Sequence, residues 1–180
     1  MKTLITLSIS LLLTVGSSYG QSGLKDARYE DLPKGVYTAL VSSGFFEGYE
    51  LYFQMSPFFQ RGDFNGDGHF DIAIQVVSKT TRKRGIVFLH DGESEYHVIG
   101  AGKPFGELGD DFSWLKQWRV DPHSLQQYRI SGMAEGLILD TPEFPKGLVY
   151  YDGQNYKVTG MDAYSYYSDE PVYSQLMPAL

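Results

Sequence analysis

The stretch GIVFLHDGESEYHVIG, residues 85–100, returns in altered form as GLVYYDGQNYKVTG, residues 147–160. In each copy, two runs rich in β-branched and aromatic residues flank a short loop that contains Asp-Gly. Such runs favour strands, and the glycine tolerates the positive φ that tight turns demand. Each copy therefore predicts an antiparallel β-hairpin, and the chain contains the same unit twice.

A further strand is predicted in front of each hairpin, at residues 70–77 and 136–141. Turns are expected at residues 78–84 and 142–146, and the prolines of the second turn exclude a continuous central strand there. The sequence therefore predicts a mainly β fold built from two three-strand antiparallel meanders. Two meanders are too few for a full propeller, which closes with at least about four blades.

Three other segments have patterns of their own. Residues 32–43 place apolar side chains at helical spacing, with Pro33 in the first turn and Gly44 just past the end, so one short N-terminal helix is expected. Residues 49–55 alternate apolar and polar side chains, as in a half-buried strand. The glycine-rich residues 101–122 predict a long structured loop with room for a helical turn.

Residues 1–20 have the parts of a secretory signal peptide: Lys2, an apolar run over residues 4–15, and small side chains at Ser18 and Gly20. We predict cleavage after Gly20 and a secreted or periplasmic protein. A retained membrane anchor is the alternative, but the run is shorter than the ~20 residues that a spanning helix needs. The mature form is therefore expected to have no transmembrane segment.

The mature chain is expected to form a single β-rich domain over residues 21–160. The last segment, residues 161–180, is rich in tyrosine and shows neither a helical nor a strand period. We expect it to be a mobile C-terminal tail, since chain ends without burial lose order. Exposed tyrosines in such a tail are suited to anchoring a partner.

Composition excludes several classes of protein. The chain has 180 residues, 15 Lys and Arg, 22 Asp and Glu, a formal net charge of −7 and no cysteine. Without cysteine there is no disulfide framework, no thiolate metal site and no cysteine nucleophile. The negative charge argues against a nucleic-acid partner, because phosphate binding rests on clustered Lys and Arg. Cations, basic proteins or neutral ligands are the expected partners.

The sequence DFNGDGHFD, residues 63–71, places oxygen-bearing side chains at loop positions 1, 3, 5 and 9 and a glycine at position 6. Ca²⁺ takes six to eight oxygen ligands, and a tight turn at the glycine lets short side chains converge on the ion. The pattern predicts a calcium site, with a bare polar turn as the alternative. The expected ligands are the side-chain oxygens of Asp63, Asn65, Asp67 and Asp71 and the backbone carbonyl of His69.

The loop is not an EF-hand, because position 12 is Ile74 rather than Glu and residues 70–77 have the pattern of a strand. Followed by the apolar strand Asp-Ile-Ala-Ile, it resembles the FG-GAP and VCBS-type repeats of secreted proteins and integrin-like β-propellers. The resemblance is specific over residues 62–77 and weaker up to Gly100. As a whole the chain resembles small bacterial secreted proteins with one such loop, and the resemblance implies calcium binding in that loop.

Other candidate sites are weaker. Asp110 and Asp111, near Trp114 and Trp118, are a candidate carboxylate pair for glycan hydrolysis, and the alternative is an aspartate that caps a helical turn. No motif of a nucleophile or a phosphate-binding loop is present, so no catalytic residue is predicted. The histidines have no metal-ligand spacing, and no zinc site is predicted; they are His69, His90, His97 and His123.

Together these patterns favour a non-enzymatic, secreted or periplasmic, calcium-binding β-rich module that recognises another macromolecule, either a protein or a glycan. Two alternatives stay open. The acidic charge is compatible with an inhibitor or immunity-type protein directed against a basic cell-wall or periplasmic enzyme. The Asp110 and Asp111 pair is compatible with a glycan or cell-wall hydrolase.

Overall fold

Two compact units make up the chain, residues 1–31 and residues 32–180. The first is described only over residues 27–31, which include a turn of 3-10 helix, η1 (Ala27–Tyr29). The predicted signal peptide and the predicted tail lie outside the described residues. The computed structural model describes residues 27–93, 95–121, 134–141 and 145–160.

The second unit is mainly β, as the sequence predicts, with two antiparallel sheets and no closed barrel or propeller in the part of the chain that is described. In the first sheet β3, β4 and β5 form the first meander, and β1 and β2 both pair with the outer edge of β3. In the second sheet the order is β6-β7-β8-β9. The strands are β1 (Tyr49–Leu51), β2 (Phe59–Gly62), β3 (Asp71–Ser78), β4 (Arg84–Leu89), β5 (Tyr96–Gly100), β6 (Gln117–Asp121), β7 (Gly136–Asp140), β8 (Pro145–Tyr151) and β9 (Tyr156–Thr159).

The two hairpins that repeat in the sequence also repeat in strand register. Val87 lies opposite Val98 in the first hairpin, and Val149 lies opposite Val158 in the second. The last pairs before the loops, Leu89 with Tyr96 and Tyr151 with Tyr156, are equivalent as well. The copies differ in the connecting loop, which is residues 90–95 in the first hairpin and the shorter 152–155 in the second.

The hairpins turn opposite faces toward a shared core. In the first hairpin, Phe88 belongs to this core and its neighbour Val87 does not. In the second hairpin, Val149, which holds the same register position as Val87, belongs to the core. Neighbouring residues of a strand point to opposite faces of the sheet. The two sheets therefore pack with non-equivalent faces of their hairpins against each other. The buried members of the core are Phe64, Ala73, Ile86, Phe88, Ile99, Leu108, Phe112, Leu115, Trp118, Leu137, Leu139, Val149 and Tyr156.

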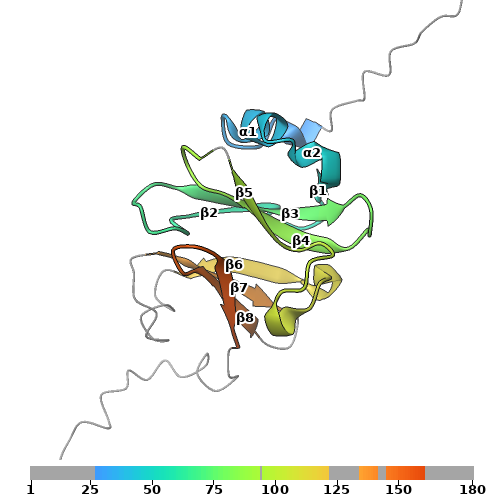
Figure 1. The fold of residues 1–180 in the computed structure, drawn as a ribbon, viewed down its shortest axis with the longest axis vertical. Coiled ribbons are helices and arrows are strands. Elements are labelled where there is room, and N and C mark those ends of the chain that lie inside the picture. Colours follow the sequence, from blue (N-terminus) through green and yellow to red (C-terminus); the bar gives the residue numbers. More distant parts are fainter. Residues whose placement is uncertain (1–26, 94, 122–133, 142–144, 161–180) are drawn as a thin grey trace, which may run out of the picture. The chain divides into compact units, whose positions relative to one another are not determined.

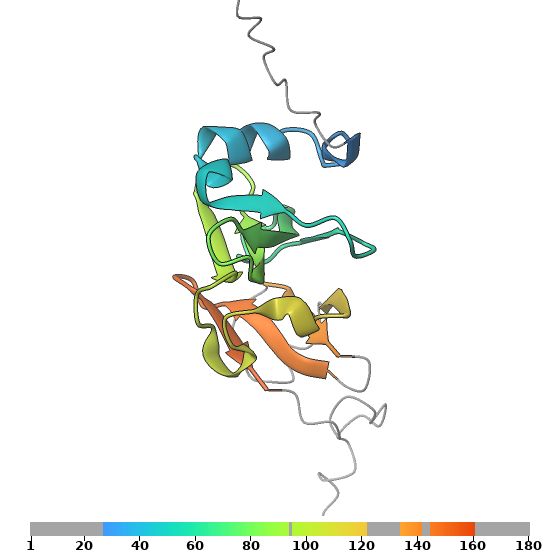
Figure 2. The same ribbon diagram turned by 90° about the vertical axis from the view of Figure 1, so that its right-hand side faces the viewer.

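Two short helices, α1 (Val36–Ser42) and α2 (Phe45–Gly48), cover the other face of the first sheet (Figures 1 and 2). Phe45 is fully buried, and its ring lies 5.4 Å from the rings of both Tyr49 and Tyr96. Because this sheet is covered on both faces, β3 is buried at every residue. None of the helices in the described part of the chain has the length and apolarity needed to cross a membrane.

Four expected segments differ from the structure in extent. The turn expected at residues 142–146 is shorter, because β8 already begins at Pro145. The helix expected at residues 32–43 spans only α1, and a second helix begins directly after Gly44, whose φ is 72°. The strand expected at residues 49–55 is β1, which ends at Leu51, although the Tyr52 N–H still donates to the Gln75 carbonyl of β3 at 2.8 Å. The loop expected at residues 101–122 contains two 3-10 turns, η2 (Gly106–Leu108) and η3 (Phe112–Trp114), and also the strand β6.

Candidate functional site

The predicted calcium loop connects β2 to β3. Gly62, at the end of β2, pairs with Asp71, the first residue of β3, so the residues between them form a closed loop. Gly66 and Gly68 have φ values of 82° and 87°, which side-chain-bearing residues rarely adopt. The loop can therefore reverse direction tightly at both glycines.

Side-chain oxygens of the loop accept hydrogen bonds from its own backbone. The two carboxylate oxygens of Asp63 accept from the N–H groups of Gly66, at 2.7 Å, and Gly68, at 3.0 Å. Asp67 accepts from the His69 N–H at 2.8 Å, and this bond is the main cause of a lowered pKa of Asp67. Asn65 donates to the second oxygen of Asp67 at 3.0 Å. The first three predicted ligand residues are thus held in one folded loop.

Asp71, the fourth of these residues, has a different environment. It is fully buried, and one of its oxygens accepts from the N–H groups of Phe64 and Asn65, at 2.8 and 3.1 Å. The other oxygen accepts from the Asp91 N–H, in the loop between β4 and β5, at 2.9 Å. Burial raises the pKa of Asp71. One carboxylate therefore joins the predicted calcium loop to the first hairpin loop.

The loop is also attached to the shared core and to the second sheet. Phe64 is buried, and its ring lies 5.3 Å from that of Phe88 in β4. The Asp63 N–H donates to Glu135, just before β7, at 2.7 Å, and the Glu135 N–H donates to the Asp63 carbonyl at 2.6 Å. Movement of this loop would therefore disturb both sheets.

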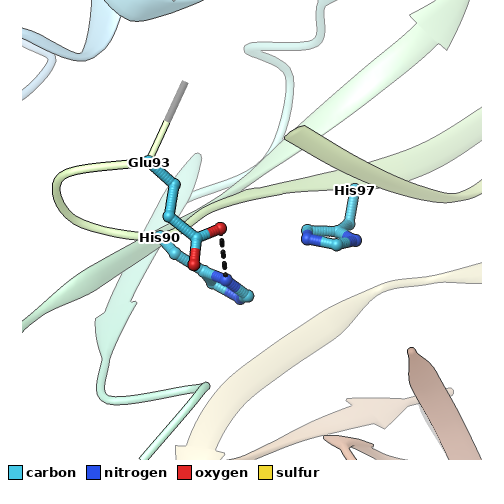
Figure 3. A group of neighbouring side chains, drawn as sticks. All are labelled: His90, Glu93 and His97. Atoms are coloured by element: carbon cyan, nitrogen blue, oxygen red, sulfur yellow. Dashed lines mark hydrogen bonds and ion pairs between the residues drawn. The ribbon is translucent and has the colours of Figure 1, made fainter. Parts of the chain in front are cut away.

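Among the described residues, one group of three His, Asp or Glu side chains could hold a metal ion. Its three ligand atoms all lie within 4.8 Å of one another. It consists of His90, Glu93 and His97 (Figure 3). Nothing in this set identifies calcium. The carboxylates of the predicted calcium loop, although they share that loop, do not form such a set.

The hairpin register explains how the two histidines meet. His97 in β5 lies directly opposite Phe88, and His90 follows two positions after Phe88, so all three point to the same face. The imidazole rings of His90 and His97 have their centroids 5.0 Å apart. Glu93 lies in the loop between them, with a carboxylate oxygen 3.1 Å from His90 Nδ1. The spacing of histidines along the sequence gives no sign of this group, because it depends on strand pairing.

Two tyrosines of the second sheet border this group. The hydroxyl of Tyr156 lies 2.8 Å from His90 Nε2, and the ring of Tyr151 lies 4.9 Å from the His90 ring and 5.6 Å from the His97 ring. Burial raises the pKa of Tyr156 well above its ordinary value and lowers the pKa of His97. At near-neutral pH the phenol is therefore un-ionised, and the His97 imidazole favours its neutral form, which binds metals.

Solvent has access to the group at Glu93 and at the half-buried His97, which lines a second cavity together with Tyr156. The Glu93 side chain is 47% exposed, whereas His90 is 3% exposed. A cavity of about 290 Å³ adjoins both residues and extends to α1 and to the exposed Phe70. An ion from solution can therefore reach the group without unfolding of the sheet.

Asp110 and Asp111 have structural roles in this fold. Asp110 forms an ion pair with Lys83. Asp111 is the N-cap of η3, accepting from the Ser113 N–H at 3.0 Å, and it also accepts from the Arg84 N–H at 3.0 Å. The capping alternative from the sequence therefore describes Asp111 correctly.

The fold and these contacts define the chain as an antiparallel β protein with a polar Asp/Asn loop and a neighbouring His/Glu group. Comparison with protein-family models, with curated proteins and with solved structures finds no match.

Proposed function

We propose that this chain is a secreted or periplasmic, non-enzymatic calcium-binding module that recognises another macromolecule, either a protein or a glycan. The observation that carries the proposal is the loop at residues 63–71. Oxygen-bearing side chains alternate with other residues along its first half, and its two glycines have positive φ, so that the loop folds back on itself. Calcium is the cation whose ligands are commonly supplied in this way. The resemblance to FG-GAP and VCBS-type loops supports the same ion.

The hydrogen bonds of the loop leave capacity for an ion. An ionised carboxylate has about four lone-pair positions, and each oxygen of Asp63 accepts one N–H bond from the protein. The Asp67 side chain is 41% exposed and can rotate toward Asp63 without unpacking the core. We expect calcium to draw these carboxylates together, because the ion offsets the repulsion between like charges.

The proposed location follows from the predicted signal peptide and agrees with the affinity expected for such a calcium site. Calcium sites of extracellular modules have dissociation constants on the order of 10⁻⁴ to 10⁻³ M, which is adequate only where calcium is abundant. The ion would have a structural role, since Phe64 connects the loop directly to the core. Calcium at ten times its dissociation constant would stabilise the fold by about 1.4 kcal/mol.

A calcium titration of the metal-free chain tests this proposal. Isothermal titration calorimetry should show one Ca²⁺ per chain, and Asp63→Asn and Asp67→Asn should each weaken binding at least tenfold, because each removes a negative charge from the loop. The matched control is Asp152→Asn, in the Asp-Gly turn of the second hairpin, which should bind as the unmodified chain does. Unchanged calcium affinity in both loop variants would contradict the proposal.

A second candidate function rests on charge. Removal of residues 1–20 deletes Lys2, so 14 basic and 22 acidic residues would leave a net charge of 14 − 22 = −8. Such a charge speeds encounter with a basic partner, as an inhibitor or immunity-type protein against a basic cell-wall enzyme requires. Capture of such an enzyme by the immobilised chain, reversed by salt, would favour this function. A hydrolase centred on Asp110 and Asp111 is not proposed, since no observation favours it over their contacts with Lys83, Arg84 and Ser113.

A further inference from the structure

We propose that His90, Glu93 and His97 form a second metal site, which takes a transition-metal dication of the Zn²⁺ type and is distinct from the calcium loop. The site goes beyond the proposed function, because it uses different residues, a different ion and a different loop. It rests on the contacts of the first hairpin and of Tyr156.

The donor atoms select the type of ion. Two imidazole nitrogens and one carboxylate oxygen suit Zn²⁺, Cu²⁺ and Ni²⁺, whereas Ca²⁺ and Mg²⁺ take oxygen ligands. Two histidines with one glutamate are an established ligand set for zinc, in which water or another ligand fills the fourth position. The 47% exposure of Glu93 leaves room on the solvent side for that fourth ligand.

The distances need little adjustment. With metal-ligand distances of about 2.0–2.2 Å, a tetrahedral site places neighbouring ligand atoms roughly 3.3–3.6 Å apart. His90 Nδ1 and the nearest Glu93 oxygen are already 3.1 Å apart, and all three ligand atoms lie within 4.8 Å of one another. Rotation of the exposed Glu93 side chain and a small shift of the His97 ring are sufficient to complete the geometry.

Tyr156 holds the first ligand in place. Metal-binding histidines almost always donate their second ring N–H to a fixed acceptor, which sets the tautomer and the orientation of the ring. The un-ionised Tyr156 hydroxyl, 2.8 Å from His90 Nε2, is such an acceptor. Without a metal, His90 Nδ1 donates to the Glu93 carboxylate, which can only accept, and the Tyr156 hydroxyl can donate to Nε2. When a metal takes the lone pair of Nδ1, the proton lies on Nε2 and is donated to the Tyr156 hydroxyl. Tyr156 is therefore a positioning residue supplied by the second sheet.

A zinc titration of the untagged chain, in buffer that contains saturating Ca²⁺ and no chelator, tests the site. Isothermal titration calorimetry should show one Zn²⁺ per chain, weakened at least tenfold by Glu93→Gln and by His97→Gln. The matched control is His69→Gln, since His69 is an exposed histidine outside the group and should leave the affinity unchanged. Because Glu93 is half exposed, its variant should keep the far-ultraviolet circular dichroism of the unmodified chain.

A pair of tyrosine variants tests the positioning role. Tyr156→Phe removes the hydroxyl beside His90 and should weaken zinc binding about 10- to 100-fold. Tyr151→Phe keeps the neighbouring ring and should leave zinc binding unchanged. Imidazole nitrogen chemical shifts measured by NMR should show a metal-bound Nδ1 and a protonated Nε2 for His90 in the unmodified chain.

The proposal is overturned if the chain binds no Zn²⁺, if Glu93→Gln and His97→Gln bind it as tightly as the unmodified chain, or if His69→Gln abolishes binding. Failure of this site and failure of the calcium loop are separable. Asp67→Asn should retain zinc binding, and Glu93→Gln should retain calcium binding.

Discussion

Asp71 is the residue on which the geometry of both loops depends. Its buried carboxylate accepts three backbone N–H groups, from Phe64, Asn65 and Asp91, in two loops that are separate in the sequence. The Phe64 donor is buried and the other two are partly buried. A buried donor that loses its acceptor keeps the free-energy cost of its desolvation without a compensating hydrogen bond. Asp71 therefore fixes the start of β3 and the relative position of the two candidate metal sites.

The substitution Asp71→Ala should lower the free energy of unfolding by at least about 3 kcal/mol, since it leaves three N–H groups without an acceptor. Urea unfolding at pH 7 in the presence of a chelator measures this loss without any contribution from metals. The control is Asp152→Ala, which removes the acceptor of two exposed N–H groups, those of Gln154 and Asn155. Water can replace that acceptor, so the control should lose much less stability, and equal losses in the two variants would contradict this role of Asp71.

At the scale of elements, close contact between strands explains the glycine that opens each repeat. A Cβ on Gly85 would lie 2.2 Å from the carbonyl oxygen of Ile99 and 2.5 Å from the Ala101 nitrogen. A Cβ on Gly147, the equivalent residue, would lie 2.9 Å from Val158. The glycines are needed for the close packing of the hairpins rather than for a turn.

The substitution Gly85→Ala should therefore lower the free energy of unfolding by roughly 3 kcal/mol or more, because backbone atoms must move to admit the methyl group. Gly48→Ala is the control, since nothing lies within 4 Å of a Cβ placed there. Thermal unfolding followed by circular dichroism should show a large fall in melting temperature for the first variant and little change for the second. A Gly85→Ala chain as stable as the unmodified one would contradict the packing argument.

Hairpins could be predicted from the sequence because local signals define them. The Asp-Gly pairs that begin at Asp91 and Asp152 mark the two loops. The β-rich runs on either side of each loop form the paired strands of the hairpin. Strand β2 has only four residues, too few for a clear period. Strand β6 alternates polar and apolar side chains, but it lies within residues 101–122, whose glycines predict a loop. The same limit applies to His90 and His97, which meet only after β4 and β5 have paired.

At the scale of the whole molecule, the shared core links the candidate sites to the fold of the second unit. Phe64 in the predicted calcium loop, Phe88 beside the His/Glu group and Tyr156 in the second sheet belong to one buried cluster. The Phe88 and Tyr156 rings are stacked with centroids 3.8 Å apart. An ion bound in either loop should therefore stabilise the packing between the sheets as well as its own loop.

Backbone hydrogen exchange with and without Ca²⁺ tests the proposed function most directly. The N–H groups of Gly66, Gly68 and His69 are bonded to carboxylates of an exposed loop, so their exchange reports on that loop alone. We predict that Ca²⁺ slows exchange of these three amides at least tenfold. Identical exchange rates in the loop with and without Ca²⁺ would contradict the assignment of residues 63–71 as a calcium site.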